Sequence, residues 1–268
     1  MKKRTLLLML SATALLMACG KNEPAAPSAA APAPATPAAI TKIVVGLDDN
    51  FPPMGFRNEQ NELVGFDIDM AREAAKRLNI NAEFKPIDWN AKEAELNGKR
   101  VDVLWNGLTI TEERKKNIAF TAPYMENHQI IIVTIASPIQ TKADLRSKTV
   151  GAQEGSSAVG AIEKEAEVAR SFKELKTFGD NITALMDLGT GRLDAVVVDE
   201  VVGRYYVAKR SSEFRVLDEH FGTEEYGVGT RLEDTELLKQ LDETLASMKQ
   251  DGTAARISTQ WFGANVTK

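Results

Sequence analysis

Residues 109–114 combine hydroxyl, acidic and basic side chains in a pattern that suits anion binding. Thr111 is expected to cap a short helix whose first turn contains two glutamates and then Arg114. The N-terminal end of a helix carries partial positive charge, so it favours acidic side chains and disfavours basic ones. Arg114 departs from this rule. Its guanidinium and free backbone N–H groups would together bind an anion such as a carboxylate. The alternative is a solvated arginine on a surface helix.

Asp199 follows a run of three valines, so it is expected to end an apolar strand. A carboxylate at such a place is costly to bury without a partner, and it would suit an ammonium group. The alternative is that Asp199 caps the helix expected from residue 200. Because Arg114 supplies the opposite charge, we favour a site for a zwitterion.

Further candidates lie in loops that follow predicted strands. Gly155, Ser156 and Ser157 are expected to open a helix, where their N–H groups and hydroxyls would hold a carboxylate; a plain helix cap is the alternative. Phe51 lies in a loop after the first strand, and Trp89 ends another strand. Both would clamp a ligand side chain, although each ring alone is more often part of a core.

Catalytic patterns are scarce in this chain. His128 and His220 are its only histidines, and neither has the spacing of a metal ligand. The chain has no nucleophile elbow and no phosphate-binding loop. The Gly-Val-Gly at 227–229 lacks the third glycine of a dinucleotide fingerprint. We therefore expect a binding protein rather than an enzyme, with no cofactor and no metal.

The elements that must position these residues alternate between strands and helices. Apolar runs predict strands, and apolar residues at helical spacing predict helices. The predicted strands lie at 42–47, 84–87, 101–105, 130–133, 149–153, 172–178 and 195–198. The predicted helices lie at 67–78, 90–96, 180–188, 200–209 and 234–250. The helix at 90–96 is expected to begin with a capping box at Asn90. This alternation predicts an α/β fold with mostly parallel sheets.

One internal repeat indicates two similar α/β units. LNGKRVDVLWNG at 96–107 aligns with LGTGRLDAVVVD at 188–199, and each segment reads as a helix end, a turn and an apolar strand. Ligands of open α/β sheets bind at the carboxyl ends of the strands. Two units facing each other would place Asn106, Gly107 and Thr109 opposite Asp199 across one cleft.

The N-terminus predicts export and lipid anchoring. Three basic residues precede an apolar run at 6–17, which is too short to span a membrane and fits a signal peptide. The run leads to Cys19, the only cysteine, in a segment that resembles a bacterial lipoprotein signal. Residues 1–18 would be removed and Cys19 lipidated; an ordinary signal peptide is the alternative. Residues 19–40 would then form a tether rich in alanine and proline.

The charge of the exported chain excludes a large class of partners. Removal of the signal peptide takes away three basic residues, which leaves 30 basic against 38 acidic residues and a net charge of about −8. No basic patch for nucleic acid is expected on such a body. Membrane association would lie in the anchor, and a single cysteine allows no disulfide within the chain.

The body resembles the extracytoplasmic substrate-binding proteins of polar amino-acid ABC importers, such as those for glutamine, histidine or cystine. The resemblance rests on VGFDID at 64–69, TITEER at 109–114, IAF at 118–120, PY at 123–124, DGT at 251–253 and WFG at 261–263. It implies a type II periplasmic-binding-protein-like fold, in which two α/β lobes are joined by two hinge strands around a ligand cleft. It also implies lobe one at 41–126 and 227–268, and lobe two with the hinge crossings at 127–226. The crossings themselves are expected near 126–129 and 224–226.

The resemblance further implies roles for single residues. Arg114, Thr109 and Ser157 would bind the α-carboxylate of an amino acid. Asp199 and the Gly107 carbonyl would bind its α-ammonium. Other positions would hold the side chain of the ligand or set its identity, and these are Asp48, Phe51, Trp89, Asn106 and Gln153.

The function implied is a receptor that captures a free amino acid with a neutral or polar side chain. It would close its lobes and deliver the ligand to a membrane permease with its ATPase. We expect a monomer in the cell envelope, outside the cytoplasm and lipid-anchored. Two alternatives remain open. Dehydratases of prephenate or arogenate share this fold, and in such an enzyme Glu154 or Asp199 would move a proton. A ligand-sensing lipoprotein would signal to a partner receptor instead.

Overall fold

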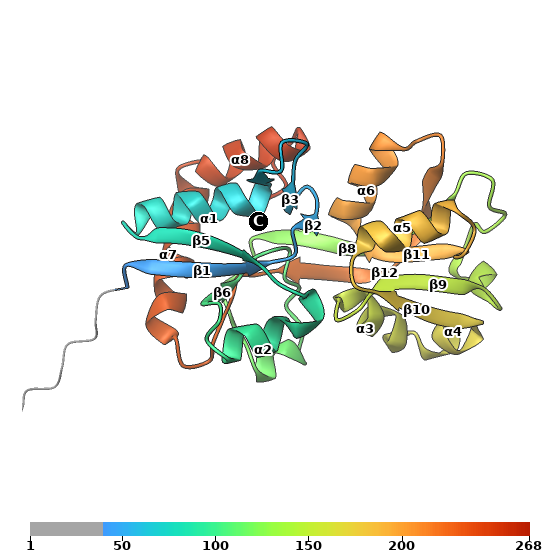
Figure 1. Cartoon of the computed structure of the whole chain (residues 1–268), viewed down its shortest axis with the longest axis horizontal. Helices are drawn as coiled ribbons and strands as arrows, with labels where there is room; N and C mark the ends of the chain where they lie inside the picture. The colour runs from blue at the N-terminus through green and yellow to red at the C-terminus, as the bar shows by residue number, and fades with distance from the viewer. Residues whose placement is uncertain (1–39) are drawn as a thin grey trace, which may run out of the picture. The chain divides into compact units, whose positions relative to one another are not determined.

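The computed structural model describes one unit of the chain, residues 40–268 (Figure 1). The predicted signal peptide, the lipidation site at Cys19 and the tether up to residue 39 lie outside the described residues, so all three remain predictions. In the described part of the chain, no helix is long and apolar enough to cross a membrane.

Two five-stranded sheets form the framework of this unit. The first has the order β5-β1-β6-β13-β7, with β1 (Lys42–Leu47), β5 (Asn81–Pro86), β6 (Val103–Leu104), β7 (Ala119–Phe120) and β13 (Gly229–Thr230). The second has the order β10-β9-β11-β8-β12, with β8 (Met125–Thr134), β9 (Thr149–Gln153), β10 (Glu174–Phe178), β11 (Ala195–Asp199) and β12 (Phe214–Tyr226). A small sheet adds β2 (Asn50–Phe51), β3 (Gly55–Arg57) and β4 (Leu63–Val64). The predicted two-lobed α/β fold is thus confirmed, with one large sheet in each lobe.

Helices cover both faces of the first sheet (Figure 1). On one face, α1 (Phe66–Arg77), α7 (Thr235–Gln250) and α8 (Thr253–Phe262) share a hydrophobic core with the sheet. On the other face, α2 (Lys92–Asn97) packs in a separate cluster. Successive side chains of a strand point to opposite faces, so β1 contributes alternate residues to the two cores.

The second sheet is covered in the same way. The helices α5 (Asn181–Gly189) and α6 (Glu200–Lys209) pack on one face. The helices α3 (Ser157–Lys164) and α4 (Ala166–Ser171) pack on the other. A 3₁₀ turn, η3 (Lys142–Leu145), precedes β9. α3 follows closely after the carboxyl end of β9. Its first residues therefore lie at the edge of the second sheet that faces the first lobe.

The prediction of mostly parallel sheets is confirmed for strand direction, in which four of the five strands of each sheet agree, but not for pairing, because two of the four pairings in each sheet are antiparallel. β1 pairs in parallel with β5 and β6, and β9 pairs in parallel with β10 and β11. The two remaining strands of each sheet form the antiparallel pairings, and of these only β13 in the first sheet and β8 in the second run against the other four strands. They lie where the chain passes from the first sheet to the second and back, so no helical crossover sets their direction. Each sheet therefore joins a parallel half to an antiparallel half.

β8 and β12 form a long antiparallel ladder between the two lobes. Asn127 lies opposite Glu224, and Met125 lies opposite Tyr226. Tyr226 also forms an isolated bridge with Thr109, which follows β6 of the first sheet. The two expected crossing segments thus lie side by side, while the residue at which each lobe ends stays a prediction.

The internal repeat has a structural counterpart in each sheet. Asp102 and Asp194 precede β6 and β11 at matching positions. The Asp102 carboxylate accepts the N–H of Val44 at 2.9 Å, and the Asp194 carboxylate accepts the N–H of Thr149 at 2.8 Å. In both parallel halves the strand that comes first in the chain lies between the second and the third. The repeat therefore reflects one β-α-β arrangement used twice.

Two predicted helix starts differ from the structure. The capping box at Asn90 is wrong, because a 3₁₀ turn, η1 (Trp89–Ala91), precedes α2 and Asp88 accepts the N–H of Asn90 at 2.9 Å. The helix expected at Arg114 is a single 3₁₀ turn, η2 (Arg114–Lys116). The chain enters β7 three residues later, which leaves no room for a longer helix.

Leu241 provides a test of the packing of α7. Its side chain is fully buried in the first core. Leu241→Ala removes buried methyl groups and leaves a cavity, so we expect the free energy of unfolding to fall by about 2–5 kcal/mol in urea denaturation. Glu243→Ala, on the exposed face of the same helix, should stay within about 0.5 kcal/mol of the wild type. Equal losses in both variants would contradict the assigned faces.

Candidate functional site

The Arg114 guanidinium points into the protein rather than into solvent. The residue is only 6% exposed, and its Nη1 donates to the Thr109 carbonyl oxygen at 2.9 Å. The solvated alternative is therefore wrong. Thr111 Oγ1 accepts the Arg114 N–H at 3.1 Å, as expected for a cap. The next N–H groups bond within the turn, so an anion would meet the guanidinium and not a row of free backbone donors.

The start of α3 lies next to Arg114. Arg114 Nη2 donates to the Gly155 carbonyl oxygen at 3.1 Å. Thr109 Oγ1 lies 3.0 Å from Ser157 Oγ. Ser156 turns away, because its hydroxyl donates at 2.8 Å to the carbonyl oxygen at the end of β9. The structure thus brings Arg114, Thr109 and Ser157 together, whereas the Ser156 side chain serves the local turn.

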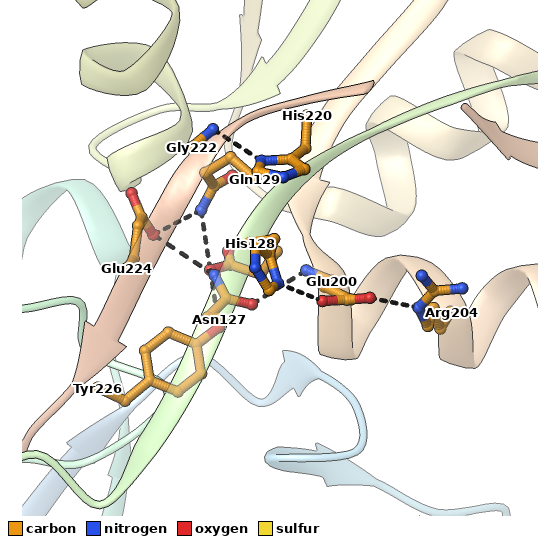
Figure 2. Close-up of polar contacts among 10 residues, drawn as sticks. Asn127, His128, Gln129, Glu200, Arg204, His220, Gly222, Glu224 and Tyr226 are labelled. Carbon is orange, nitrogen blue, oxygen red and sulfur yellow. Dashed lines mark hydrogen bonds and ion pairs between the residues drawn. The ribbon is translucent and has the colours of Figure 1, made fainter. Parts of the chain in front are cut away.

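Glu224 completes this cluster, although the sequence predicts it only as part of a hinge crossing. Its Oε2 accepts hydrogen bonds from Thr109 Oγ1 at 2.9 Å and from Ser157 Oγ at 3.0 Å. It accepts a further bond from Gln129 Nε2 at 2.9 Å, and Figure 2 shows these two side chains facing each other. No local signal separates Glu224 from the glutamate that follows it, since its place depends on the pairing of β12 with β8.

Asp199 is buried at the end of β11, and polar side chains of the hinge strands surround it. Its Oδ1 accepts from Asn127 Nδ2 at 2.7 Å and from Gln129 Nε2 at 3.0 Å. It also accepts from Tyr226 Oη at 2.8 Å. The Asp199 side chain does not cap α6; Asn127 Oδ1 accepts the first N–H of that helix at 3.0 Å. The capping alternative is therefore wrong.

Opposite charges are buried together in this cluster. Burial lowers the pKa of Arg114, and the carboxylates of Glu224 and Asp199 oppose that shift. Burial and the neighbouring Glu224 raise the pKa of Asp199, while the Tyr226 hydrogen bond lowers it. An uncompensated buried charge is strongly destabilising. The two carboxylates repel each other, and the guanidinium stabilises both of them.

Asp48, Asn106 and Gln153 form a second polar contact. Gln153 Nε2 donates to Asp48 Oδ2 at 2.7 Å, and Asn106 Oδ1 accepts the Asp48 N–H at 3.1 Å. Burial raises the pKa of Asp48, and hydrogen bonds from the Asn50 N–H and from Gln153 oppose the shift. Asn181 Nδ2 donates to Gln153 Oε1 at 2.9 Å, which fixes the orientation of the Gln153 amide.

Gly107 and Phe51 pack against each other. Gly107 has a φ of +58°, and a Cβ there would lie 2.8 Å from Phe51 Cε1, so glycine alone fits without a shift. The Gly107 N–H donates to Asp67 Oδ2 at 2.7 Å, which orients this peptide. Phe51 is 5% exposed and Trp89 is 6% exposed, and each belongs to a hydrophobic cluster. The structure therefore places both rings in hydrophobic cores.

A cavity of about 680 Å³ opens beside Arg114 between α2 and α3. Ser156 and Ser157 line it together with Glu224 and Lys92. Lys92 is thus a further residue that lies beside the Arg114 cluster. Since ligand pockets commonly span about 300–1,000 Å³, this cavity is large enough to admit a small molecule to the Arg114 cluster.

The two histidines lie together on the hinge strands. The rings of His128 and His220 pack edge to face with their centroids 4.8 Å apart. His128 Nδ1 lies 2.7 Å from Glu200 Oε2, and Figure 2 shows this contact beside Arg204. Between residues 40 and 268, no group of three or more His, Cys, Asp or Glu side chains is placed to hold a metal ion.

The chain resembles known proteins along almost the whole of the described body. Residues 43–264 match the family described as bacterial extracellular solute-binding proteins, family 3. The L-cystine-binding protein TcyJ of Escherichia coli strain K12 is 34% identical over 228 residues, which cover 84% of each chain. The histidine-binding periplasmic protein of Salmonella typhimurium is 34% identical over 234 residues, or 84% of this chain and 89% of that one.

Solved structures agree with this similarity. A substrate binding protein of an ABC uptake transporter from Streptococcus pneumoniae, solved with bound histidine, has a TM-score of 0.82 and 36% identity, and the match covers 85% of this chain and 94% of that one. An ancestral arginine-binding protein bound to arginine has a TM-score of 0.80 and 39% identity, with 84% and 100% covered. Both matches extend over the two lobes described above.

Asp67, buried beneath Gly107, predicts a pH-dependent stability. Burial raises its pKa from 3.8 to about 7. The folded state thus binds more protons than the unfolded state between these values, so the contribution of this carboxyl is fully present below its unfolded pKa and is lost as the pH rises through about 7. Asp67→Asn keeps an acceptor for the Gly107 N–H and the Tyr124 hydroxyl but does not titrate.

In urea denaturation at a series of pH values, the wild type should therefore lose stability relative to Asp67→Asn between about pH 4 and about pH 8. Asp218→Asn, a change of a solvent-exposed carboxyl on β12, serves as the control and should follow the wild type. Parallel curves for wild type and Asp67→Asn would show that burial does not perturb this carboxyl.

Proposed function

Because the chain belongs to family 3 of the bacterial extracellular solute-binding proteins, we propose that it is an extracytoplasmic receptor for a free amino acid. It binds its ligand between two lobes and delivers it to the permease and ATPase of an ABC importer. Two relatives are named for cystine and histidine, and two structural neighbours hold histidine and arginine. These names support an amino acid as the class of ligand.

The observation that carries this proposal is that buried Arg114 and buried Asp199 belong to one hydrogen-bond network. Glu224 and Gln129 link them, since Gln129 Nε2 donates to both carboxylates. A free amino acid presents a carboxylate and an ammonium group on one carbon. It is therefore complementary to a cation and an anion that are buried close together.

We assign the α-carboxylate of the ligand to Arg114, with the hydroxyls of Thr109 and Ser157 beside it. We assign the α-ammonium to Asp199 and the Gly107 carbonyl. The side chain of the ligand then extends toward the second polar contact and the aromatic rings, formed by Asp48, Phe51, Trp89, Asn106 and Gln153. A neutral or polar side chain suits this end, because burial disfavours the charged form of the Asp48 carboxyl.

Contacts across the lobe interface support capture by closure. Asn90 Nδ2 donates to Glu154 Oε1 at 3.0 Å, and Gln153 donates to Asp48. A ligand that touches both lobes favours the arrangement in which such contacts form, because it gains interactions there that an open arrangement lacks. Ligand binding and lobe closure are therefore coupled to each other.

The cellular placement is also part of the proposal. Residues 1–18 act as the signal peptide, Cys19 carries the lipid, and residues 19–40 tether a monomeric body outside the cytoplasm. The lobes comprise residues 41–126 with 227–268, and residues 127–226. Mass spectrometry of the exported protein tests the anchor: a chain that begins elsewhere than at Cys19, or that carries no lipid there, contradicts it.

Thermal denaturation of the full chain with a panel of L- and D-amino acids tests the receptor function. A ligand present at 100 times its Kd should stabilise the folded state by about 2.7 kcal/mol, which raises the midpoint measurably. Arg114→Ala should abolish the shift, because the carboxylate loses its buried cation. Arg256→Ala, a change of an exposed arginine on α8, is the matched control and should keep the shift.

The same panel includes prephenate and arogenate. A shift with these cyclic acids and with no amino acid would contradict the receptor and indicate a dehydratase. Loss of the thermal shift in both Arg114→Ala and Arg256→Ala would contradict the assignment of Arg114 to the binding site, but not the receptor function. Uptake of the labelled ligand should fall in cells without the gene, whereas unchanged uptake would favour a sensing lipoprotein.

A further inference from the structure

The Gly155 carbonyl oxygen accepts two cationic donors from the opposite lobe. Arg114 Nη2 donates to it at 3.1 Å, and Lys92 Nζ donates to it at 2.8 Å. Gly155 lies between β9 and α3, whereas Lys92 is the first residue of α2 and Arg114 the first of η2. One carbonyl of the second lobe is thus held from two elements of the first.

Lys92 occupies an unusual environment for a lysine. The residue is only 4% exposed, although lysine is seldom buried without a partner. Its ammonium also donates to the Trp89 carbonyl oxygen at 3.3 Å and lies 5.4 Å from the centroid of the Trp89 ring. Both acceptors are neutral main-chain oxygens, and among residues 40–268 no carboxylate is hydrogen-bonded to this ammonium.

The charges around Lys92 come from three elements. Burial and the Arg114 guanidinium of η2 lower its pKa from 10.5 to about 7. Glu93 of α2 and Asp88, which precedes η1, oppose that shift. The placement of Lys92 therefore costs free energy, and a purely structural contact between these loops would not need a cation.

The loop around Gly155 is packed closely against the first lobe. Gly155 has a φ of +70°, and a Cβ there would lie 2.8 Å from Asn90 Cα. The adjacent Glu154 accepts a hydrogen bond from Asn90 Nδ2 at 3.0 Å. The Gly155 carbonyl is consequently held in a region with little space for a substitute donor.

This geometry matters when a carboxylate reaches Arg114. The carboxylate competes with the Gly155 carbonyl oxygen for Nη2, and the loss of a donor from this partly buried carbonyl costs free energy. A carbonyl oxygen turned toward a carboxylate also repels it. Lys92 keeps a donor on this oxygen and, when it is protonated, a positive charge, so Arg114 is free to turn to the ligand.

We infer that Lys92 is a positioning residue of the carboxylate site, which holds the Gly155 carbonyl so that Arg114 can bind the ligand. This inference rests on the proposed function. It concerns the affinity for the carboxylate end of the ligand and the closing of the lobes there, and it assigns Lys92 no contact with the ligand itself.

Isothermal titration of the full chain with L-cystine, L-histidine and L-arginine tests the inference. Lys92→Met keeps the length of the side chain but removes the donor and the charge, so Kd should rise about 10-fold or more for each probe that binds the wild type. Lys92→Arg restores a cationic donor and should recover most of the affinity. Lys76→Met, at a lysine of α1 whose side chain is 79% exposed, is the matched control and should bind as the wild type does.

Two results would overturn the inference while the receptor function stands. One is a wild-type Kd in Lys92→Met. The other is an equal loss of affinity in Lys92→Met and Lys92→Arg, since a role in packing alone predicts no rescue by charge. Melting curves recorded without added ligand confirm that each variant is folded.

If none of the three amino acids binds the wild type, they are not ligands of the proposed receptor. A second measurement then tests the role of Lys92 without any ligand. The carbonyl carbon of Gly155, labelled with ¹³C, should shift in NMR spectra as the pH passes through the pKa of Lys92 near 7. The shift should vanish in Lys92→Met. A Gly155 resonance that titrates identically in both proteins overturns the inference without reference to any ligand.

Discussion

The structure depends on keeping one guanidinium charge, that of Arg114, out of water. Desolvation of an ion costs several kcal/mol even after the protein relaxes, so the charge is stable only among donors, acceptors and opposite charges. Arg114 bonds one carbonyl oxygen from each lobe, and Glu224 and Asp199 supply negative charge. The next residue, Lys115, instead pairs with exposed Glu112, where water screens the attraction and the pair contributes little. Arg114 and Lys115 carry the same charge, so the difference between these two neighbours is that Arg114 is buried and Lys115 is exposed to water.

The same requirement explains the side chains of the hinge strands. Alternate residues of a strand share one face, so Asn127 and Gln129 lie on one face of β8. They reach buried Asp199, and Gln129 also reaches half-buried Glu224. Farther along that face, Ile131 and Val133 enter the apolar core of the second lobe. The change from amide to aliphatic side chains along one strand marks the boundary between the site and the core. Because both hinge strands contribute polar groups, the connection between the lobes is also part of the network that holds the charges.

The sequence predicts those features that depend on neighbours along the chain. The ranges of β1, β9 and α6 match their predictions at both ends, since apolar periodicity is a local property. Asp199 is recognisable because a carboxylate directly after three valines has to be buried. Glu224 is not recognisable, because its environment arises from the pairing of β12 with β8, two segments far apart in sequence. The burial of Lys92 is not recognisable for a similar reason. A lysine at the start of a short helix normally faces water, and its contact with the Gly155 carbonyl joins two segments far apart in sequence.

Glu224 sets a condition on how a carboxylate can bind beside Arg114. A hydroxyl has one proton to donate, so Thr109 Oγ1 and Ser157 Oγ, which both contact Glu224, cannot donate to Glu224 and to a ligand at the same time. Gln129 resolves this competition, because its amide donates to Glu224 and to Asp199 and needs neither hydroxyl. When the hydroxyls turn toward a ligand, Glu224 therefore keeps its hydrogen bond from Gln129, and its carboxylate continues to oppose the desolvation of Arg114. The charged groups Arg114, Glu224 and Asp199 thus keep their arrangement, while the hydroxyls of Thr109 and Ser157 are free to change hydrogen-bond partners.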